Sequence, residues 1–412
     1  MLPTDWRGNA MQTRIRRRYA AERRFRWIGL GAVMLSGFFL AFLLFTMVGN
    51  GLRGFTYTSA MVTFDFPASG LNIAPERFAD ADIDQQLVTA GIEDIVDFAA
   101  EESLGSADIL SDSSWTVLRD AIKTDPGLLA GKATIALPVA SAIDIARKGD
   151  GGKAAKDEAA QLDRAGLLST GIHWPFLTGA DATDPAVAGI WGALKGSLLT
   201  ILIAFAIAFP VGVLAAVYLE EYAPKGRWTD MIEVSINNLA AVPSIIFGLL
   251  ALAVFIQFLG VCQASPLVGG MTLALMTMPV IVIASRNAIK AVPPSIRDAA
   301  LGVGASKVQV VFHHVLPLAL PGIMTGTIIG MARALGETAP LLLVGMRAFI
   351  GDVPDGLCSA SSVLPMQIFL WSDEVDRGFV EKTSAAIIVL LVVLLSMNAL
   401  AIYLRNRFEK RW

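Results

Sequence analysis

Long apolar stretches alternate with polar segments along the whole chain. A helix of about 20 apolar residues crosses a hydrocarbon core about 30 Å thick, so each stretch of that length predicts a membrane span. Six stretches qualify: 27–48, about 197–219, about 234–259, 267 to about 284, 315–344 and 385–404. The pattern predicts an all-α integral membrane protein with six transmembrane helices.

Eight arginines precede the first apolar stretch, an arrangement shared by signal peptides and uncleaved anchors. The anchor is favoured because the apolar run exceeds the roughly 7 to 15 residues of a signal peptide, and no clear small-x-small cleavage site follows. Basic flanks stay in the cytoplasm. An even number of spans then places the C-terminal cluster on the same side: Arg405, Arg407, Lys410 and Arg411. We expect a multi-pass protein of the cell inner membrane with both termini cytoplasmic.

The segment between the first two spans is acidic. Residues 51–185 hold 21 Asp and Glu against 10 Lys and Arg, whereas the whole chain has a net charge of only −3. We expect a mostly helical periplasmic domain, and a solvated surface explains its charge better than a cation or protein site. The predicted organisation is a basic N-terminus (1–26), a first transmembrane helix (27–50), this extracytoplasmic domain (51–185) and a core with five spans (186–412).

Composition agrees with a membrane protein, since 54% of the residues are apolar and 17% charged. The two cysteines, Cys262 and Cys358, fall in outward loops after the third and fifth spans. An oxidising compartment permits a disulfide between them, but the sequence leaves both the paired and the free state open. His313 and His314 are adjacent and His173 is distant, so no metal site is expected.

The polar segment after the fourth span predicts a short helix that docks on a partner. Pro293 and Pro294 end the preceding helix, and Ser295 with Asp298 predicts a capping box. The small apolar face of this helix, beside Arg297 and Lys307, consists of Ala299, Ala300 and Leu301. Such a face is unfavourable in water unless a partner covers it, as in helix-in-groove docking.

Asp298-Ala299-Ala300, Gly304 and Leu316-Pro317 resemble the EAA loop of binding-protein-dependent ABC importers, with the family's spacing. Asp298 replaces the usual Glu, and His314 the usual Ile. The resemblance implies an ABC importer permease core over 186–412, with a coupling loop over 295–317 that sits in a cleft of an ATPase subunit. The expected coupling residues are Arg297, Asp298, Ala299, Ala300, Leu301, Gly304, Lys307, Leu316 and Pro317. An amphipathic linker is the alternative.

The fifth span combines small residues with a charged pair. Gly322, Gly326 and Gly330 recur every four residues and predict close helix packing. Arg333 and Glu337 follow, and a charge within a span costs about 2.5 to 3.5 kcal/mol on insertion scales. One interpretation is an ion pair between residues i and i+4. The other is a phosphate path, because a guanidinium offers a donor fork suited to phosphate oxygens. Helix rise places Arg333 roughly 20 Å into the span, in its outer half.

The segments 322–326 and 332–341, the latter Ala-Arg-Ala-Leu-Gly-Glu-Thr-Ala-Pro-Leu, are similar to the signature of phosphate ABC permeases of the PstA type. Further similarity lies at 217–222, 242–249 and 364–368, so that the resemblance covers about 190–412. It implies that Arg333 lies on the phosphate path, with Glu337 and Thr338 in the same motif.

One position departs from the family. Many relatives carry an Arg followed three positions later by Glu at the end of the fourth span, where this chain has Ile283 and Arg286. Arg286 is either a substitute in the substrate pathway or a residue that snorkels to the membrane surface, and we favour the second interpretation.

These features predict a non-enzymatic permease subunit of an ABC importer for inorganic phosphate. No phosphate-binding Gly-x-x-x-x-Gly-Lys-Ser/Thr loop is present, so no cofactor is expected on this chain, and ATP-Mg belongs to the ATPase partner. The implied partners are two copies of that ATPase, a second homologous permease, a periplasmic phosphate-binding protein and membrane lipid, without nucleic acid. The alternatives are an importer for sulfate or molybdate, and a stand-alone secondary carrier.

Overall fold

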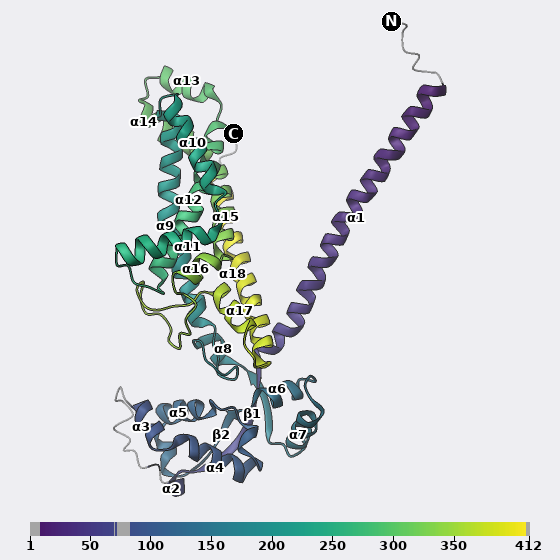
Figure 1. The fold of residues 1–412 in the computed structure, drawn as a ribbon, viewed down its shortest axis with the longest axis vertical. Coiled ribbons are helices and arrows are strands. Elements are labelled where there is room, and N and C mark those ends of the chain that lie inside the picture. The colour runs from purple at the N-terminus through teal and green to yellow at the C-terminus, as the bar shows by residue number, and fades with distance from the viewer. Residues whose placement is uncertain (1–8, 70, 72–82, 409–412) are drawn as a thin grey trace. The chain divides into compact units, whose positions relative to one another are not determined.

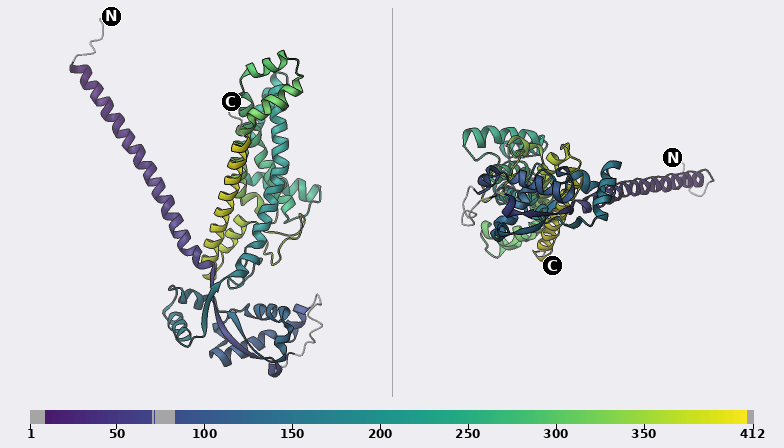
Figure 2. Two further views of the ribbon diagram at one scale, coloured as in Figure 1. Left: turned by 180° about the vertical axis from the view of Figure 1, so that it is seen from behind. Right: turned by 90° about the horizontal axis from the view of Figure 1, so that it is seen from below.

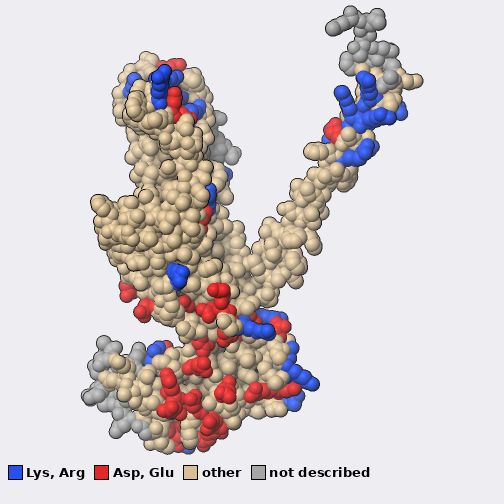
Figure 3. All heavy atoms as spheres, in the orientation of Figure 1, with Lys and Arg blue, Asp and Glu red and all other residues tan. Residues whose placement is uncertain are grey.

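A computed structural model describes residues 9–69, 71 and 83–408. Arg7, Lys410 and Arg411 of the predicted basic clusters lie outside this range. The chain divides into two compact units, Met1–Asn50 and Gly51–Trp412. Most of the first unit is helix α1 (Asn9–Gly54), which contains the first predicted span and whose arginines gather towards its N-terminal end (Figure 3).

Four long helices form the membrane bundle of the second unit (Figures 1 and 2). They are α9 (Trp191–Val217), α12 (Pro266–Lys290), α15 (Leu316–Leu335) and α18 (Gly378–Phe408). Helix α12 packs against α9 and α15, and α15 also packs against α18. Within the described residues, these four helices and α1 are long and apolar enough to cross a membrane, which confirms the predicted helical membrane fold.

Shorter helical segments extend or connect the long helices. They are the π-helical η4 (Tyr218–Tyr222), α13 (Pro294–Gly302), α14 (Lys307–Gln309), the π-helical η6 (Val310–Val315), α16 (Ala339–Leu343) and α17 (Leu364–Ser372). Helix α13 and the end of α18 lie at the same end of the bundle (Figures 1 and 2).

The third span differs from the straight helix expected over 234–259. Helix α10 (Arg227–Ala240) meets α11 (Ser244–Ala251) and its π-helical continuation η5 (Leu252–Phe258) at an angle of 100°. Pro243 has no backbone N–H, so it cannot continue the hydrogen bonds of α10. Its ψ of 136° is extended, and α11 begins at the next residue. The described chain has six spans only if this bent pair counts as one. The side on which each terminus lies therefore stays a prediction.

The fifth span is shifted towards the N-terminus and covers Lys307–Leu335 instead of 315–344. Helix α15 ends at Leu335 instead of Val344, and three non-helical residues separate it from α16, which has Pro340 in its first turn. Arg333 therefore lies in the last turn of a helix, and not within a continuous span as expected. A basic residue is favourable there, because the C-terminal end of a helix carries partial negative charge.

The contact between α12 and α15 depends on small residues, as the sequence predicts. A Cβ atom added to Gly322 would lie 2.7 Å from the Cβ of Ala288, and one added to Gly326 would overlap the Cβ of Ala284. Both glycines therefore allow the two backbones to approach more closely than any larger residue would.

The insertion between α1 and α9 contains a three-stranded antiparallel sheet, in the order β2 (Lys132–Pro138), β1 (Thr56–Asp65), β3 (Leu168–Ile172). Ala60, Val62 and Phe64 alternate with exposed residues along β1 and enter the core of the insertion. This sheet was not predicted from the sequence, because β2 and β3 have only seven and five residues and β3 includes Gly171, which weakens a strand signal.

Helices make up most of the rest of the insertion, and Asp and Glu side chains gather on its surface (Figure 3). Its helices are α2 (Phe66–Ser69), α3 (Ile83–Thr89), α4 (Ile92–Leu104), α5 (Ser114–Thr124), α6 (Ser141–Arg147), α7 (Lys153–Arg164) and α8 (Trp174–Thr178), with 3-10 turns η2 (Ala107–Ile109) and η3 (Pro126–Ala130). Helices α4 and α5 pack against β1 and β2.

Gly326→Ala is expected to weaken the contact between α12 and α15 by about 1–3 kcal/mol, as added methyl groups do in packed cores. The measurement is the thermal unfolding midpoint of the detergent-purified complex. Gly330→Ala is the matched control, since its Cβ would meet Val280 at an ordinary 3.7 Å. Adding Ala284→Gly to Gly326→Ala removes the overlapping methyl group and should restore stability. If the double variant stays as unstable as Gly326→Ala, the contact between residues 326 and 284 is not the cause of the lost stability.

Candidate functional site

Helix α13 is the short helix predicted after the fourth span, but it is capped differently. It starts at Pro294, so that Ser295 lies inside the first turn, and no side chain caps that turn. The predicted capping box of Ser295 with Asp298 is therefore wrong. The box lies at α14, where the Ser306 Oγ accepts from the Gln309 N–H at 3.3 Å and the Gln309 Oε1 accepts from the Ser306 N–H at 2.9 Å.

An apolar patch surrounds the turn between α13 and α14. Leu301, Val303 and Val308 are 47%, 86% and 56% exposed, and we call these three residues the coupling patch. Gly304 makes the turn with φ +90°, a conformation that strains residues with a Cβ. Ala300 was expected on this exposed face, but it is buried in the core formed with the ends of the long helices.

The other predicted coupling residues divide between surface and bundle. Asp298, Ala299 and Lys307 are exposed, whereas Leu316 and Pro317 are half-buried at the start of α15. His314, at the position of the usual Ile, is exposed on η6.

Arg297 faces its own chain and holds α13 against the bundle. Its Nη2 and Nε donate to Glu221 Oε1 at 2.7 and 3.0 Å. Its Nη1 also donates to the carbonyl of Val292 at 2.7 Å, and its Nη2 to the carbonyl of Ile289 at 3.0 Å. Because these carbonyls are at the end of α12 and just beyond it, Arg297 bonds α13 directly to that helix and, through Glu221, to η4.

Arg286 does not snorkel, contrary to the interpretation favoured from the sequence. Its side chain is buried near the end of α12 and forms ion pairs with Glu220 of η4 and, at 2.7 Å, with Glu233 of α10. Lys290 adds a longer contact of 3.5 Å to Glu220. A buried arginine is tolerated when carboxylates and hydrogen bonds compensate its charge. Glu220 and Glu221 belong to the family-like segment 217–222, and nothing in the sequence indicated their arginine partners.

Arg333, Glu337 and Thr338 lie together where α15 gives way to α16. The Arg333 Nε lies 3.4 Å from Glu337 Oε1, and the two side chains are 55% and 21% exposed. Within the described residues the remaining guanidinium N–H groups of Arg333 have no protein partner. The Thr338 carbonyl accepts from the N–H of Leu342 at the start of α16.

Arg286 and Arg333 belong to separate polar sites. The contacts of Gly326 with Ala284 and Gly322 with Ala288 make α12 and α15 antiparallel neighbours, and the same register places Arg333 at the level of Thr277. Arg286 is nine residues further along α12, roughly 14 Å at 1.5 Å per residue. The structure therefore does not bring Arg286 to the predicted pathway residues.

The structure joins Cys262 to Cys358, with a Cα–Cα distance of 5.5 Å. The bond ties the loop after η5 to the loop before α17, across 96 residues. No group of His, Cys, Asp or Glu able to hold a metal occurs in the part of the chain that the structure describes.

Comparison with known proteins finds one family match in the N-terminal part of the chain and another in the C-terminal half. Residues 208–412 match the family described as binding-protein-dependent transport system inner membrane component, and residues 12–157 match a domain of unknown function (DUF3333). The bundle and its α13 loop are thus an inner membrane permease component. Phosphate transport system permease protein PstA 1 of Mycobacterium tuberculosis (strain CDC 1551 / Oshkosh) is 34% identical over 220 residues, which are 53% of this chain and 70% of that protein.

A second relative is the phosphate transport system permease protein PstA of Yersinia pestis, 31% identical over 219 residues, 53% of this chain and 72% of that protein. This chain therefore belongs to the PstA family of ABC importer permeases. It is a permease subunit and not itself an enzyme. The inward-facing MetNI methionine ABC transporter is 20% identical, with a TM-score of 0.40 over 54% of this chain and 95% of its own.

Arg286→Met is expected to leave two carboxylates without their buried partner and to lower stability by about 3–5 kcal/mol. Lys290→Met removes a neighbouring charge that is 51% exposed and lies 3.5 Å from Glu220, so it should change stability by less than about 1 kcal/mol. Thermal unfolding of the purified complex measures both. Equal effects of the two substitutions would contradict the structural role of Arg286.

Proposed function

We propose that this chain conducts inorganic phosphate through an ATP-driven importer and that Arg333 contacts the phosphate on its way. The observation that carries the proposal is family membership, because the relatives that match residues of the permease core are phosphate transport permeases. The segment 332–341, which contains Arg333, Glu337 and Thr338, is the part of the chain most similar to the signature of such permeases.

The geometry of Arg333 suits a transient phosphate contact. Glu337 engages only one of its N–H groups, at 3.4 Å, and an ion pair this exposed contributes about 0–1 kcal/mol. A phosphate dianion can therefore replace the carboxylate at little cost and accept two parallel N–H bonds. Glu337 then returns to Arg333 when phosphate leaves, so the pair favours passage over tight binding.

The coupling patch gives this chain a place to receive an ATPase. Val303 is 86% exposed at the tip of the turn, and Arg297 ties α13 to α12. We propose that each of two ATPase subunits binds ATP-Mg and that one of them covers this patch. A second homologous permease would complete the pathway, and a periplasmic phosphate-binding protein would deliver the substrate. Closure of the ATPases then shifts the bundle between inward-open and outward-open states.

The proposed orientation places the coupling patch and both termini in the cytoplasm, with the insertion in the periplasm. It counts the bent pair α10 and α11 as one span and follows the distribution of basic residues. An importer for sulfate or molybdate would share the coupling loop but not the segment 332–341. A stand-alone secondary carrier would have no use for the coupling patch.

Arg333→Ala is expected to lower ATP-dependent phosphate uptake at least about tenfold in vesicles containing the assembled complex, because the phosphate loses its cationic contact. Arg333→Lys keeps the charge but loses the donor fork and should retain part of the activity. Sulfate and molybdate are added as competitors. Normal uptake by the assembled Arg333→Ala complex would show that Arg333 does not contact the phosphate. Strong competition by sulfate or molybdate would show that one of these anions, and not phosphate, is the substrate.

Val303→Glu is expected to weaken association with the ATPase at least about tenfold, because docking would bury an unpaired carboxylate, and tenfold in affinity corresponds to about 1.4 kcal/mol. Copurification of the ATPase with the tagged permease measures the association. Val375→Glu makes the same substitution at a valine that is 97% exposed just before α18, outside the loop 295–317, and should bind normally. An undiminished yield with Val303→Glu would mean that the ATPase docks elsewhere.

A further inference from the structure

A buried lysine lies near the start of α18, and no carboxylate of the described residues contacts it. Lys382 is 6% exposed, and its Nζ lies 2.5 Å from His173 Nδ1 and 3.1 Å from the carbonyl of Gly54. The ammonium also lies 5.2 Å from the centre of the Phe176 ring. Burial of an ammonium is unfavourable unless its hydrogen bonds are satisfied. Here all of its partners come from the two ends of the insertion, where the chain enters from α1 and leaves towards α9.

His173 is built to accept that hydrogen bond. It is fully buried, and its Nε2 lies 2.7 Å from the carbonyl of Ala186, so Nε2 carries the proton and Nδ1 is free to accept from Lys382. Burial, followed by the charge of Lys382, lowers the pKa of His173 to about 3. The ring is therefore neutral at physiological pH and does not repel the ammonium.

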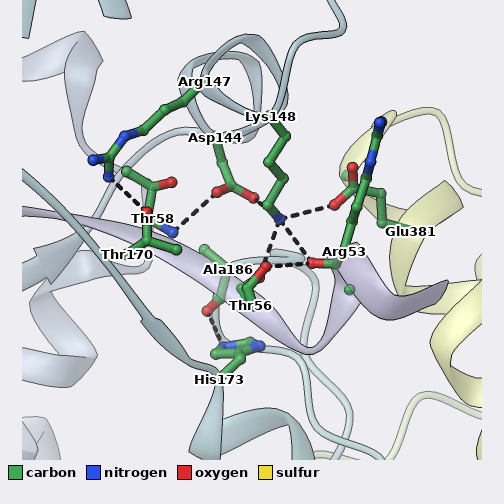
Figure 4. Close-up of polar contacts among 12 residues, drawn as sticks. Arg53, Thr56, Thr58, Asp144, Arg147, Lys148, Thr170, His173, Ala186 and Glu381 are labelled. Carbon is green, nitrogen blue, oxygen red and sulfur yellow. Dashed lines mark hydrogen bonds and ion pairs between the residues drawn. The ribbon is translucent and has the colours of Figure 1, made fainter. Parts of the chain in front are cut away.

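A second lysine makes a parallel contact from the side of the insertion (Figure 4). Lys148, at the end of α6, forms ion pairs with Asp144 at 2.7 Å and with Glu381 of α18 at 2.8 Å. It also donates to the carbonyls of Arg53 and Thr56, each at 3.0 Å. A single ammonium thus links the end of α1, the start of β1, α6 and the first turn of α18.

A third contact lies at the N-terminus of α18. The Ser141 Oγ donates to Asp376 Oδ2 at 2.8 Å, while Asp376 Oδ1 accepts from the N–H of Gly378, the first residue of α18. Gly378 packs so closely on Pro185 that an added Cβ would lie 2.6 Å from its ring. The carboxylate of Asp376 therefore caps α18 and at the same time bonds the surface of the insertion.

We propose that these contacts form a rigid joint through which the insertion moves as one body with the first turns of α18 while the permease changes conformation. The joint consists of the Lys382–His173, Lys148–Glu381 and Ser141–Asp376 contacts. The three contacts join α18 and the residues just before it to three separate residues of the insertion, which limits movement of one part on the other. Anything that binds the insertion therefore acts directly on α18, which packs against the helix that carries Arg333.

The test uses the full chain in its complex, with Ser141→Cys and Asp376→Cys bridged by a short bifunctional thiol reagent. The native cysteines are already joined to each other, and the two single-cysteine variants are controls. ATP hydrolysis by the complex is the readout, because it reports the conformational cycle whatever the cargo is. A failure of phosphate transport is thus kept apart from a failure of this proposal.

We expect efficient bridging and a hydrolysis rate within twofold of the unbridged double variant. A bridge that slows hydrolysis tenfold or more would show that the insertion must move on α18, and a pair that cannot be bridged would show that the two surfaces do not meet. Either result overturns the joint.

Lys148 supplies a second measurement with matched controls. Lys148→Met should lower the yield of the same bridge several-fold, because Asp144 and Glu381 lose their shared cation, and Lys148→Arg should restore part of it. Arg147→Met is the control, since among the described residues the Arg147 side chain bonds Asp163, Thr170 and Leu168, all within the insertion. A yield unchanged by Lys148→Met, or lowered equally by Arg147→Met, would refute the assignment of Lys148 to the joint.

Discussion

The close contact of α12 with its two neighbours is the constraint on which the membrane part depends. Lipid chains are as apolar as the helices, so helices in a bilayer associate through packing and hydrogen bonds more than by hiding apolar surface. Helix α12 meets α15 at Gly322 and Gly326, and it meets α9 at Gly270, where an added Cβ would lie 2.6 Å from Ile203. This spacing sets the height of Arg333 on α15 relative to Arg286 on α12.

At the end of the bundle that carries α13, ion pairs add to the close packing of small residues. Glu220 and Glu221 are adjacent on the π-helical η4, yet they bind different arginines, Arg286 on α12 and Arg297 on α13. Short π-helical turns are often found at functional sites. Because Arg297 also bonds carbonyls at and just beyond the end of α12, the helix that presents the coupling patch is continuous, through hydrogen bonds, with the helix at the centre of the bundle.

The insertion is stabilised differently from the membrane bundle, because it has an apolar core of its own. Its sheet and helices enclose an apolar core of their own, with Val62, Phe64 and Leu118 among its buried members. Its junction with α18 combines an apolar cluster, which contains Phe176 of the insertion and Phe379 of α18, with two lysines, a neutral histidine and a shared helix cap. Polar groups that are fully satisfied at a junction specify one geometry more narrowly than apolar contact does, because hydrogen bonds are directional. The two parts can therefore fold around separate cores and still meet in a defined way.

The sequence by itself determined the membrane class, four of the long helices, the short helix after the fourth span and the spacing of Gly322 and Gly326, since these depend on local composition and period. The end of α15 and the bend before α11 were not predicted. A long apolar run shows that a segment can lie in the bilayer, but it does not show where the helix within that segment ends. Only the tertiary structure decided that Arg286 pairs and does not snorkel, and that Cys262 meets Cys358. Both outcomes depend on residues more than 50 positions away in the chain, and local pattern carries no information about which distant groups a fold will bring together.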